Sequence, residues 1–580
     1  MGGRPRGRRS GRGRLVVVAL AVLVAWFGVG VRLFQLQIVQ AADLKEMGLE
    51  QRAKVKVLAA ERGTIYDREG RELAITVQGK TIGADTDHLQ QPAQVAELLA
   101  VTLGIDQAHV LATLQSGRRW VTIARQIDAE TAAQVERLEL PGIYSYPEAM
   151  RVYPEGSLAA QVLGFVDPDG NGLEGLEYRY DEQLSGTPGE VRFEQDLDGN
   201  VIPQGQYDVR PAIPGSDLVT TIDRDIEFIA ERECKATLER TKAKRCTAVV
   251  LDPFTGEVLA IAVVPGFDPN DRSASTQDEW VNWAVLGTYE PGSTEKLITV
   301  AAAIEENAVN AGTTFEVPDV IEVVDGACEG RLSTAGDQIN GCYHDAERHP
   351  TEILSVKDIV TRSSNVGTIL VGKRLGDSNL ARYIDAFGLG RKTGADVPGE
   401  SPGRLNLDPT CPSCFASAAI GYSVSVTPLQ MAAAYGVVAN DGVWVQPHLV
   451  REVVDGSGVH RPISPEERRV ISVDTALVMR SLLRNVIESD EGTGENARIP
   501  GYTAAGKTGT ARKFVEGEGY TDDYVVSFVG MAPASNPRIV IGVVVDSPKI
   551  GSSGGSVAAP AFSKIAEDTL HRLGVPPDAS

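Results

Sequence analysis

An uncharged apolar segment near the N-terminus constrains this chain more than any other feature of its sequence. Six arginines and no acidic residue occupy the first fourteen positions, and LVVVALAVLVAWFGVGV follows from Leu15 to Val31, extended by RLFQLQIV to Val39. This stretch is long enough to cross a bilayer and longer than the apolar core of a cleavable signal peptide. We therefore expect an uncleaved signal anchor, with the arginines in the cytoplasm and everything after about residue 40 outside the cell membrane.

The rest of the chain is long enough to fold into more than one domain. It has 580 residues, of which 42% are hydrophobic, so two or more buried cores are expected. The net charge is −22 even with the basic tip included, and the main body is therefore strongly acidic. An acidic body of this kind argues against nucleic acid as a partner.

The segment GYTAAGKTGTA, which begins at Gly501, has two interpretations. It matches the phosphate-binding loop pattern through Gly506, Lys507 and Thr508, and it also contains the K-T-G sequence of a serine enzyme that handles peptides or β-lactams. A phosphate loop should join a buried strand to a helix, but the residues before Gly501 are polar and Gly509 follows where the helix should start. Nucleotides are also scarce outside the membrane, so we favour the K-T-G strand.

Two further motifs fit a serine nucleophile. In YEPGSTEKLITV, Ser293 and Lys296 are spaced three residues apart, which on a helix is nearly one turn and puts hydroxyl and amine on one face. A desolvated lysine near another cation can be neutral enough to take the serine proton. In IVTRSSNVGTIL, Ser363 and Asn365 form S-x-N. Each motif alone is more often a helix cap, so their order along the chain carries the inference.

Together these motifs resemble those of class B penicillin-binding proteins, the membrane-anchored D,D-transpeptidases that cross-link peptidoglycan. Other segments similar to the family in the same order are ERGTIYDREGRELA, RVYPEGSLAAQVLGFV, GLEGLEYRYDEQLSGTPG, GSDLVTTIDRDIE, AVVLDPFTGEVLAIAVVPGFDPN, FGLGRKTGADVPGE and GYSVSVTPLQMAAAYGVVANDG. The resemblance covers nearly the full length. It explains a second K-T-G at Lys392 as part of another segment, and DYVVSFVGMAPASNPRIVIGVVVDSP resembles the branch that builds division or sporulation septa.

The resemblance implies a multidomain α+β architecture. We expect a basic cytoplasmic tail (1–14), a transmembrane anchor (15–39), an elongated mixed α/β pedestal of the dimerisation type (40–218), and a transpeptidase domain (219–580). The last should be similar to serine β-lactamases, with an antiparallel sheet covered by helices.

The resemblance also assigns roles to residues. Ser293 is the expected nucleophile and Lys296 its proton acceptor, with Ser363 as proton relay and Asn365 holding the substrate amide. The expected carboxylate-binding and substrate-binding residues follow in one segment: Lys507, Thr508, Gly509 and Thr510. The backbone N–H groups of Ser293 and Thr510 are the expected oxyanion hole. Neither a cofactor nor a catalytic metal is expected.

The expected reactants and partners are peptidoglycan stem peptides and glycan strands, β-lactam antibiotics, the membrane, a polymerising glycosyltransferase and division proteins. Two other classes of function stay open. A D,D-carboxypeptidase or β-lactamase would pass the acyl-enzyme to water, although the middle motif is S-S-N and not the S-D-N of class A β-lactamases. A divisome scaffold or β-lactam sensor would use the fold only for binding, which the intact motifs argue against.

Two features depart from a simple pattern. Position 295 is Glu, where family members often carry an apolar residue. If Glu295 faced Lys296 it would keep the amine charged, so we expect its side chain to point elsewhere.

The chain also has six cysteines, Cys234, Cys246, Cys328, Cys342, Cys411 and Cys414. Outside the cell they favour disulfides, and we expect pairing in sequence order, with a zinc site formed by the last four as the alternative.

Overall fold

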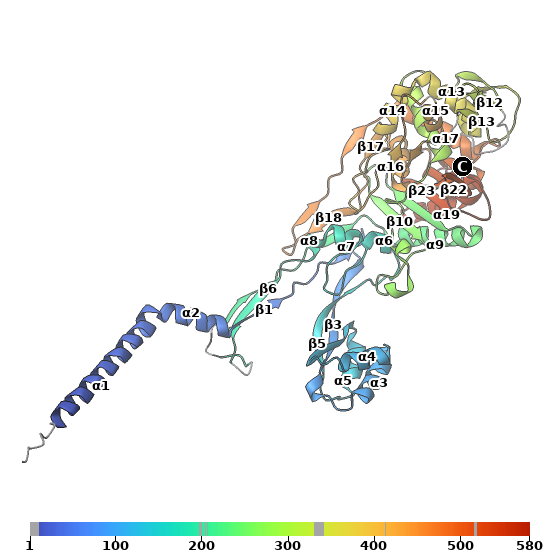
Figure 1. Ribbon diagram of the computed structural model, residues 1–580. Coiled ribbons are helices and arrows are strands. Elements are labelled where there is room, and N and C mark those ends of the chain that lie inside the picture. The colour runs from blue at the N-terminus through green and yellow to red at the C-terminus, as the bar shows by residue number, and fades with distance from the viewer. Residues whose placement is uncertain are drawn as a thin grey trace, which may run out of the picture. The chain divides into compact units, whose positions relative to one another are not determined.

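The computed structural model describes residues 11–196, 200–203, 205, 207–329, 341–411, 413–515 and 519–579. The chain forms two compact units, each built from two stretches of sequence (Figure 1). The first unit comprises Met1–Glu61 and Gly186–Pro214, and the second comprises Arg62–Ser185 and Gly215–Ser580.

The first unit contains the apolar N-terminal segment. Helix α1 (Gly11–Phe34) continues through a short π-helical turn (Gln35–Val39), and helix α2 (Ala41–Arg52) follows. Strand β1 (Ala53–Leu58) then pairs antiparallel with β6 (Gly189–Glu194), which pairs with β7 (Tyr207–Arg210). The two stretches of sequence that form this unit are therefore joined by a three-stranded sheet.

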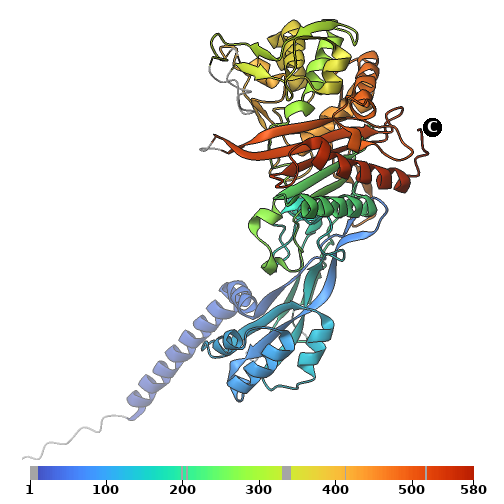
Figure 2. The ribbon, with the colours of Figure 1, turned by 90° about the vertical axis from the view of Figure 1, so that its right-hand side faces the viewer.

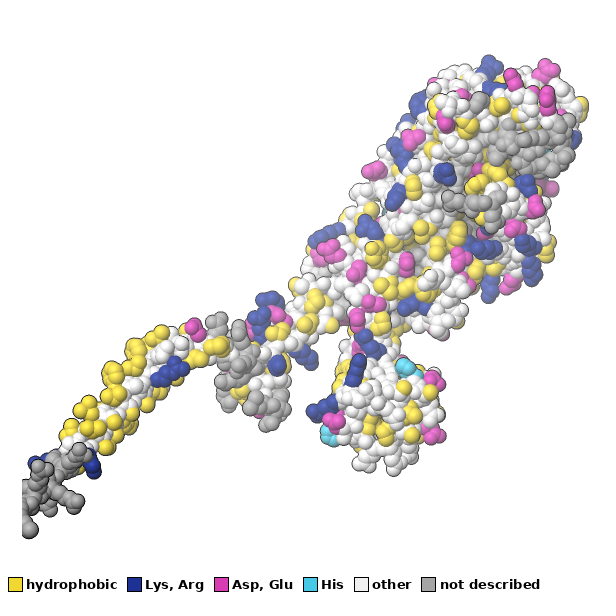
Figure 3. All heavy atoms as spheres, in the orientation of Figure 1, with side chains coloured by type: hydrophobic (Ala, Val, Ile, Leu, Met, Phe, Trp, Pro, Cys, Tyr) yellow, Lys and Arg dark blue, Asp and Glu magenta, His cyan; other side chains and the backbone are white. Residues whose placement is uncertain are grey.

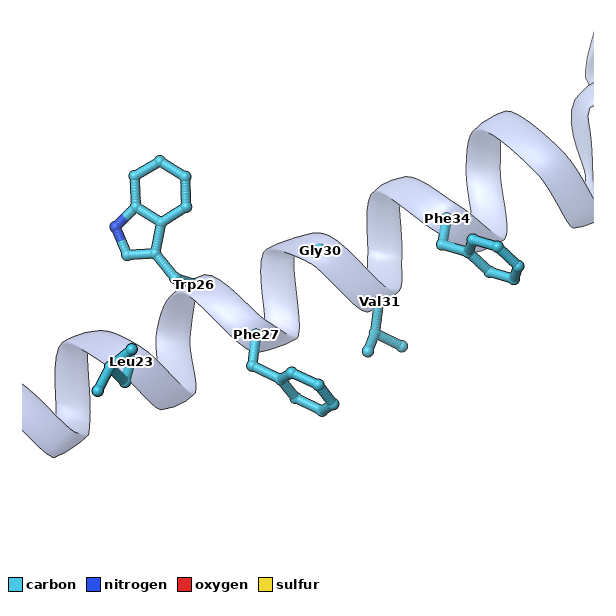
Figure 4. Close-up of a pocket in the computed structure, with 6 residues that line it drawn as sticks. All are labelled: Leu23, Trp26, Phe27, Gly30, Val31 and Phe34. Atoms are coloured by element: carbon cyan, nitrogen blue, oxygen red, sulfur yellow. The ribbon is translucent and has the colours of Figure 1, made fainter.

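The apolar side chains of helix α1 are exposed on all sides of the helix, and Figure 3 shows those on the face toward the viewer. Among the described residues, Arg12–Val39 is the one helical stretch long and apolar enough to cross a membrane, and none of its most apolar window is buried. The shallow hollow in Figure 4 lies between side chains of this same helix: Leu23, Trp26, Phe27, Gly30, Val31 and Phe34. A soluble helix would bury such a face, so this exposure suits a helix whose solvent is lipid.

The second unit begins with the part of the chain that we expected to be the pedestal. The long strand β3 (Glu72–Asp85) lies between β4 (Trp120–Ile127) and β5 (Ile143–Val152), and helices α3 (Pro92–Leu103), α4 (Gln107–Leu114) and α5 (Ala129–Glu136) pack against them. A small apolar core that includes Ile82, Leu99 and Val110 lies between sheet and helices. These elements form a separate lobe in Figures 1 and 2.

Three of the quoted family-like segments meet at one buried ion cluster. Glu177, in helix α7 (Gly175–Arg179), is fully buried and accepts hydrogen bonds from Arg62 Nε at 2.7 Å and Arg151 Nε at 2.7 Å. Arg62 also contacts Asp181 of helix α8 (Asp181–Leu184) at 2.7 Å. The ion pairs of this cluster therefore hold together segments of the chain that are more than a hundred residues apart in sequence.

A short parallel pairing joins this region to the C-terminal part of the same unit. Strand β2 (Ile65–Tyr66) pairs antiparallel with β3 and parallel with β8 (Asp217–Thr220), and β8 pairs with β18 (Val450–Val454). The boundary that the sequence suggested between residues 218 and 219 falls inside β8, which belongs to this continuous sheet.

The C-terminal part is built on an antiparallel sheet covered by helices, as the sequence predicted. The strand order is β10-β9-β23-β22-β21 and every neighbouring pair is antiparallel. The strands are β9 (Arg245–Leu251), β10 (Val258–Val264), β21 (Ala505–Val515), β22 (Gly519–Ala532) and β23 (Ile539–Asp546). Strand β9 is buried on both faces, because Ala248 and Val250 enter one apolar cluster while Val249 and Leu251 enter the other.

Helices lie on both faces of this sheet (Figure 2). Helices α9 (Arg224–Thr241) and α19 (Ala559–Arg572) cover one face, and α16 (Pro428–Ala439) covers the other. Beyond α16 lies a helical lobe that consists of α11 (Lys296–Glu305), α12 (Val356–Arg362), α13 (Asn365–Leu375), α14 (Asp377–Ala386), α15 (Cys414–Ala418) and α17 (Val473–Glu488). The S-x-x-K and S-x-N motifs lie in or beside this lobe, and the K-T-G motif lies in the edge strand β21.

Two of the three cysteine pairs expected from sequence order form disulfides. Cys328 bonds to Cys342, and Cys411 bonds to Cys414. Cys234 and Cys246 are instead buried free thiols, so the third expected disulfide is absent between these two described residues. Because the other four sulfurs bond to one another, they are not the thiolates of the alternative zinc site.

Candidate active site

The serine of the first motif lies in a tight turn that packs against a neighbouring loop. A 3₁₀ turn (Gly292–Thr294) precedes α11, and Ser293 is half-buried in it. Gly292 has φ +54° and its N–H donates to Gly421 O at 3.0 Å. A Cβ on Gly421 would lie 2.0 Å from Gly292 O, so glycine is required for the two backbones to approach this closely.

Lys296 starts α11 with its amine buried and in hydrogen-bond contact with the second motif. Its Nζ donates to Ser363 O at 2.6 Å and to Asn365 Oδ1 at 2.7 Å, and lies 3.4 Å from Ser363 Oγ. Burial lowers the pKa of Lys296 to about 7, against the opposing attraction of Asp345 and Glu295. A substantial fraction of this amine is therefore neutral near neutral pH.

The second motif lies at a break between two helices. Helix α12 ends at Arg362 and α13 begins at Asn365, with Ser363 between them in the left-handed region at φ +61°. This conformation is uncommon for a residue with a side chain and is typical of functional sites, where surrounding contacts hold it in place. Here the contact is Lys296, which binds the Ser363 carbonyl oxygen.

Asp345, which the sequence interpretation missed, fixes the second motif from the other side. Its carboxylate accepts hydrogen bonds from the backbone N–H groups of Asn365 and of Val366 (3.1 Å), and from Ser364 Oγ at 2.7 Å. Asp345 follows strand β13 (Cys342–His344), and Asn365 Nδ2 donates to His344 O at 3.0 Å. The motif spacing carries no signal for this residue, because its partners are about twenty positions away.

The third motif lies in strand β21. Lys507 is buried, and its Nζ lies 3.3 Å from Thr508 Oγ1 and 3.4 Å from Thr508 O. Burial lowers the pKa of Lys507 well below its usual value, and the charge of Lys296 acts in the same direction. The amines of Lys296 and Lys507 are therefore close enough for the charge of the first to lower the pKa of the second, although the two residues lie at opposite ends of the domain sequence.

Two glycines allow this strand to press against the serine turn. A Cβ on Gly509 would lie 2.8 Å from Pro291 O, and a Cβ on Gly292 would lie 3.0 Å from Thr510 O. Thr510 is further held through its Oγ1, which accepts from Gly554 N at 3.2 Å. The structure thus brings the backbone of Thr510 beside the turn that carries Ser293.

The same geometry excludes the phosphate-loop alternative. Lys507 and Thr508 lie within a strand that pairs with β22, and no helix follows them in this described segment. The second K-T-G lies elsewhere, in a loop after α14, where the backbone N–H of Thr393 donates to Glu400 Oε1 at 2.6 Å.

The carboxyl of Glu295 is hydrogen-bonded to Thr299. The carboxyl is fully buried, and Thr299 Oγ1 lies 3.1 Å from its Oε2 one helical turn further along α11. Burial raises the pKa of Glu295 well above its usual value, a shift only partly opposed by Thr299 and Lys296. Burial therefore disfavours the charge on Glu295 that would raise the pKa of Lys296.

Two family models match this chain. Residues 246–567 match the Penicillin binding protein transpeptidase domain, and residues 57–220 match the Penicillin-binding Protein dimerisation domain.

Named relatives and solved structures agree with these matches. The chain is 36% identical to penicillin-binding protein PbpB of Mycobacterium tuberculosis over 98% of its own length and 85% of the relative's, and 30% identical to peptidoglycan D,D-transpeptidase FtsI of Escherichia coli over 97% and 91%. The crystal structure of penicillin-binding protein 3 from M. tuberculosis complexed with aztreonam superposes with a TM-score of 0.70 at 32% identity, covering 90% of this chain and 98% of that one.

Proposed function

Because this chain belongs to the class B penicillin-binding proteins of the division type, we propose that it is a peptidoglycan D,D-transpeptidase that works through an acyl-enzyme on Ser293. The observation that carries the proposal is the environment of Lys296. A buried amine whose pKa is about 7 follows the serine by three residues, and it is bound to both functional residues of the S-x-N motif.

The hydrogen bonds around Lys296 suit a proton acceptor. A neutral amine has two N–H donors and one lone pair, and the two short contacts to Ser363 O and Asn365 Oδ1 use both donors. The lone pair then stays available for the proton of Ser293 Oγ–H. This arrangement supports Lys296 as the base of acylation.

The expected reaction has two stages. Ser293 Oγ attacks the carbonyl carbon between the two D-Ala residues of a stem peptide while Lys296 takes the serine proton. As the C–N bond breaks, Ser363 relays a proton to the leaving nitrogen and D-Ala departs. An amine of a second stem peptide then attacks the acyl-enzyme, returns Ser293 to its free form and completes the cross-link. A β-lactam enters the first stage, and its acyl product resists the second.

The remaining groups come from strand β21, the serine turn and the start of α13. The backbone N–H groups of Ser293 and Thr510 form the oxyanion hole, which stabilises charge that develops only in the tetrahedral state. Asn365 holds the substrate amide, Gly509 leaves room for the substrate backbone, and Lys507 with Thr508 binds the terminal carboxylate. A substrate carboxylate next to Lys507 would restore the positive charge that burial disfavours.

Mass spectrometry of the full chain in detergent after incubation with penicillin tests this proposal. We expect a long-lived adduct that peptide mapping assigns to Ser293, no adduct in Ser293→Ala, and a normal adduct in the control Ser457→Ala, which changes an exposed serine in a turn after β18. An adduct that clears rapidly would favour a carboxypeptidase or β-lactamase. A folded protein without any adduct would favour a scaffold.

We further propose that α1 anchors the protein in the cell membrane with its N-terminus in the cytoplasm. Residues 40–218 then serve as the pedestal and residues 219–580 as the catalytic domain. A polymerising glycosyltransferase and division proteins bind the anchor or the pedestal at the septum. The six arginines among the first fourteen residues support the orientation. Alkaline phosphatase fused after residue 580 should be active in cells, and an inactive fusion would refute the orientation.

Cross-linking from photoreactive residues placed in α1 should capture the glycosyltransferase, and its absence from the products would refute that partner.

A further inference from the structure

We infer that Asp345 is a positioning residue that acts on the reaction through Asn365 and Lys296. We also infer that His349, when it is protonated, offsets part of the negative charge of Asp345. The inference rests on the proposed role of Lys296 as base. It adds to the three motifs a carboxylate that none of them contains.

The contacts of Asp345 explain how it positions Asn365. One carboxylate oxygen accepts the backbone N–H groups of Asn365 and Val366, which are unpaired donors of the first turn of α13. The other accepts Ser364 Oγ–H at 2.7 Å. A negative charge at a helix N-terminus is also favourable in itself. Asp345 therefore fixes the start of α13, and with it the side chain that binds Lys296 Nζ.

Asp345 also acts on Lys296 by its charge. Among the groups that oppose the effect of burial on the pKa of Lys296, Asp345 comes first and Glu295 second. Burial raises the pKa of Glu295 well above its usual value, and the interaction of Lys296 with Lys507 on β21 is unfavourable when both amines are charged. Asp345 is therefore the carboxylate whose charge most favours the protonated form of this amine.

His349 lies on the far side of the same carboxylate. Its Nε2 is 3.0 Å from Asp345 Oδ2, and its Nδ1 is 2.8 Å from Pro350 O. Although burial alone lowers the pKa of His349, the bonds to Pro350 and Asp345 raise it overall. The imidazolium form, present at mildly acidic pH, offsets part of the negative charge that Lys296 experiences.

The test is the pH dependence of acylation by penicillin in the full chain, with each rate expressed relative to the plateau of the same variant. The wild type should reach half of its plateau near pH 7, where Lys296 loses its proton. Asp345→Asn keeps an oxygen for the α13 backbone but removes the charge, so the midpoint should fall by about one pH unit. At pH 6 the relative rate should then rise about five-fold.

Two further variants separate charge from structure. His349→Gln can still donate to Asp345 but cannot become charged, so its midpoint should move to higher pH. Asp128→Asn removes the same charge from the N-terminus of helix α5, where Asp128 accepts the N–H groups of Glu130 and Thr131, and should leave the profile unchanged. Relative rates remain measurable even if a variant is less stable or slower.

Opposite shifts in Asp345→Asn and His349→Gln would support the inference. A slower Asp345→Asn with an unshifted midpoint would show a purely structural role and overturn it, as would shifts of the two variants in the same direction. If the acylation rate of the wild type did not change with pH near pH 7, the assignment of Lys296 as base would be overturned as well. Failure of the further inference can therefore be distinguished from failure of the proposed function.

Discussion

Replacing Glu177 by glutamine removes a carboxylate that two buried arginines share. Arg62 and Arg151 both donate to it at 2.7 Å, and the exposed fractions of the three side chains are 7%, 4% and 0%. Glutamine has nearly the same shape, but its NH₂ group must face one of the two guanidinium groups, which have no acceptor to offer it. Arg62 keeps its contact with Asp181, whereas Arg151 loses its ion pair.

The expected cost is that of breaking one buried ion pair, about 3–5 kcal/mol of unfolding free energy. With a urea m-value of about 3 kcal/mol/M, the unfolding midpoint should fall by roughly 1–1.7 M. Urea titration of the full chain in detergent, followed by circular dichroism, measures the shift. Formation of the proposed penicillin adduct on Ser293 would tell whether the C-terminal part is still folded at each urea concentration.

The matched control is Asp568→Asn, which breaks a surface ion pair with Arg232 whose side chains are 36% and 45% exposed. That pair should contribute less than about 1 kcal/mol. If Glu177→Gln cost no more than this control, the argument that a shared buried carboxylate holds the three segments together would be wrong.

Two other changes have direct consequences. Gly509→Ala puts a methyl group 2.4 Å from Ser527 Oγ and 2.8 Å from the backbone oxygen of Pro291. Because the backbone contact cannot be relieved by a side-chain rotation, the serine turn must move away from β21, and we expect acylation at least about ten-fold slower. Gly312→Ala, where the nearest atom is 3.6 Å away, is the neutral control in the same penicillin assay. Burial raises the pKa of Glu231, so its contribution to stability is lost as pH rises above the ordinary range of a glutamate. Glu231→Gln can still accept from Ala159 N and should therefore match the wild type near pH 5 but unfold at higher urea than the wild type at pH 8; equal midpoints at pH 8 would contradict the shift.

The parts of the fold and site that could be predicted depend on local patterns. An uninterrupted apolar run indicates a membrane helix whatever surrounds it, and a hydroxyl three residues before a lysine indicates a shared face. The antiparallel sheet followed from the family resemblance, and the structure agrees. Disulfide pairing in sequence order held for Cys328 with Cys342, whose separation is only 14 residues.

The parts that could not be predicted depend on contacts between distant segments. Asp345 belongs to no motif, and its importance follows from hydrogen bonds to α13 that only the folded chain creates. Cys234 and Cys246 fit the even count of cysteines, yet both are buried as thiols. The chemistry required of Lys296 indicates that Glu295 points elsewhere, but the hydrogen bond of Glu295 to Thr299 is visible only in the folded structure.

The burial of Lys296 has a consequence for the time at which this chain becomes reactive. The partners of its amine lie 67 and 69 residues further along, and β21, which closes the other side of the serine turn, is added more than two hundred residues after Ser293. Until these segments assemble, the lysine is in water, where its pKa is near 10.4 and it is protonated. If Ser293 is the nucleophile that we propose, a newly made chain is unreactive until the domain has folded, and acylation by penicillin would report completed folding.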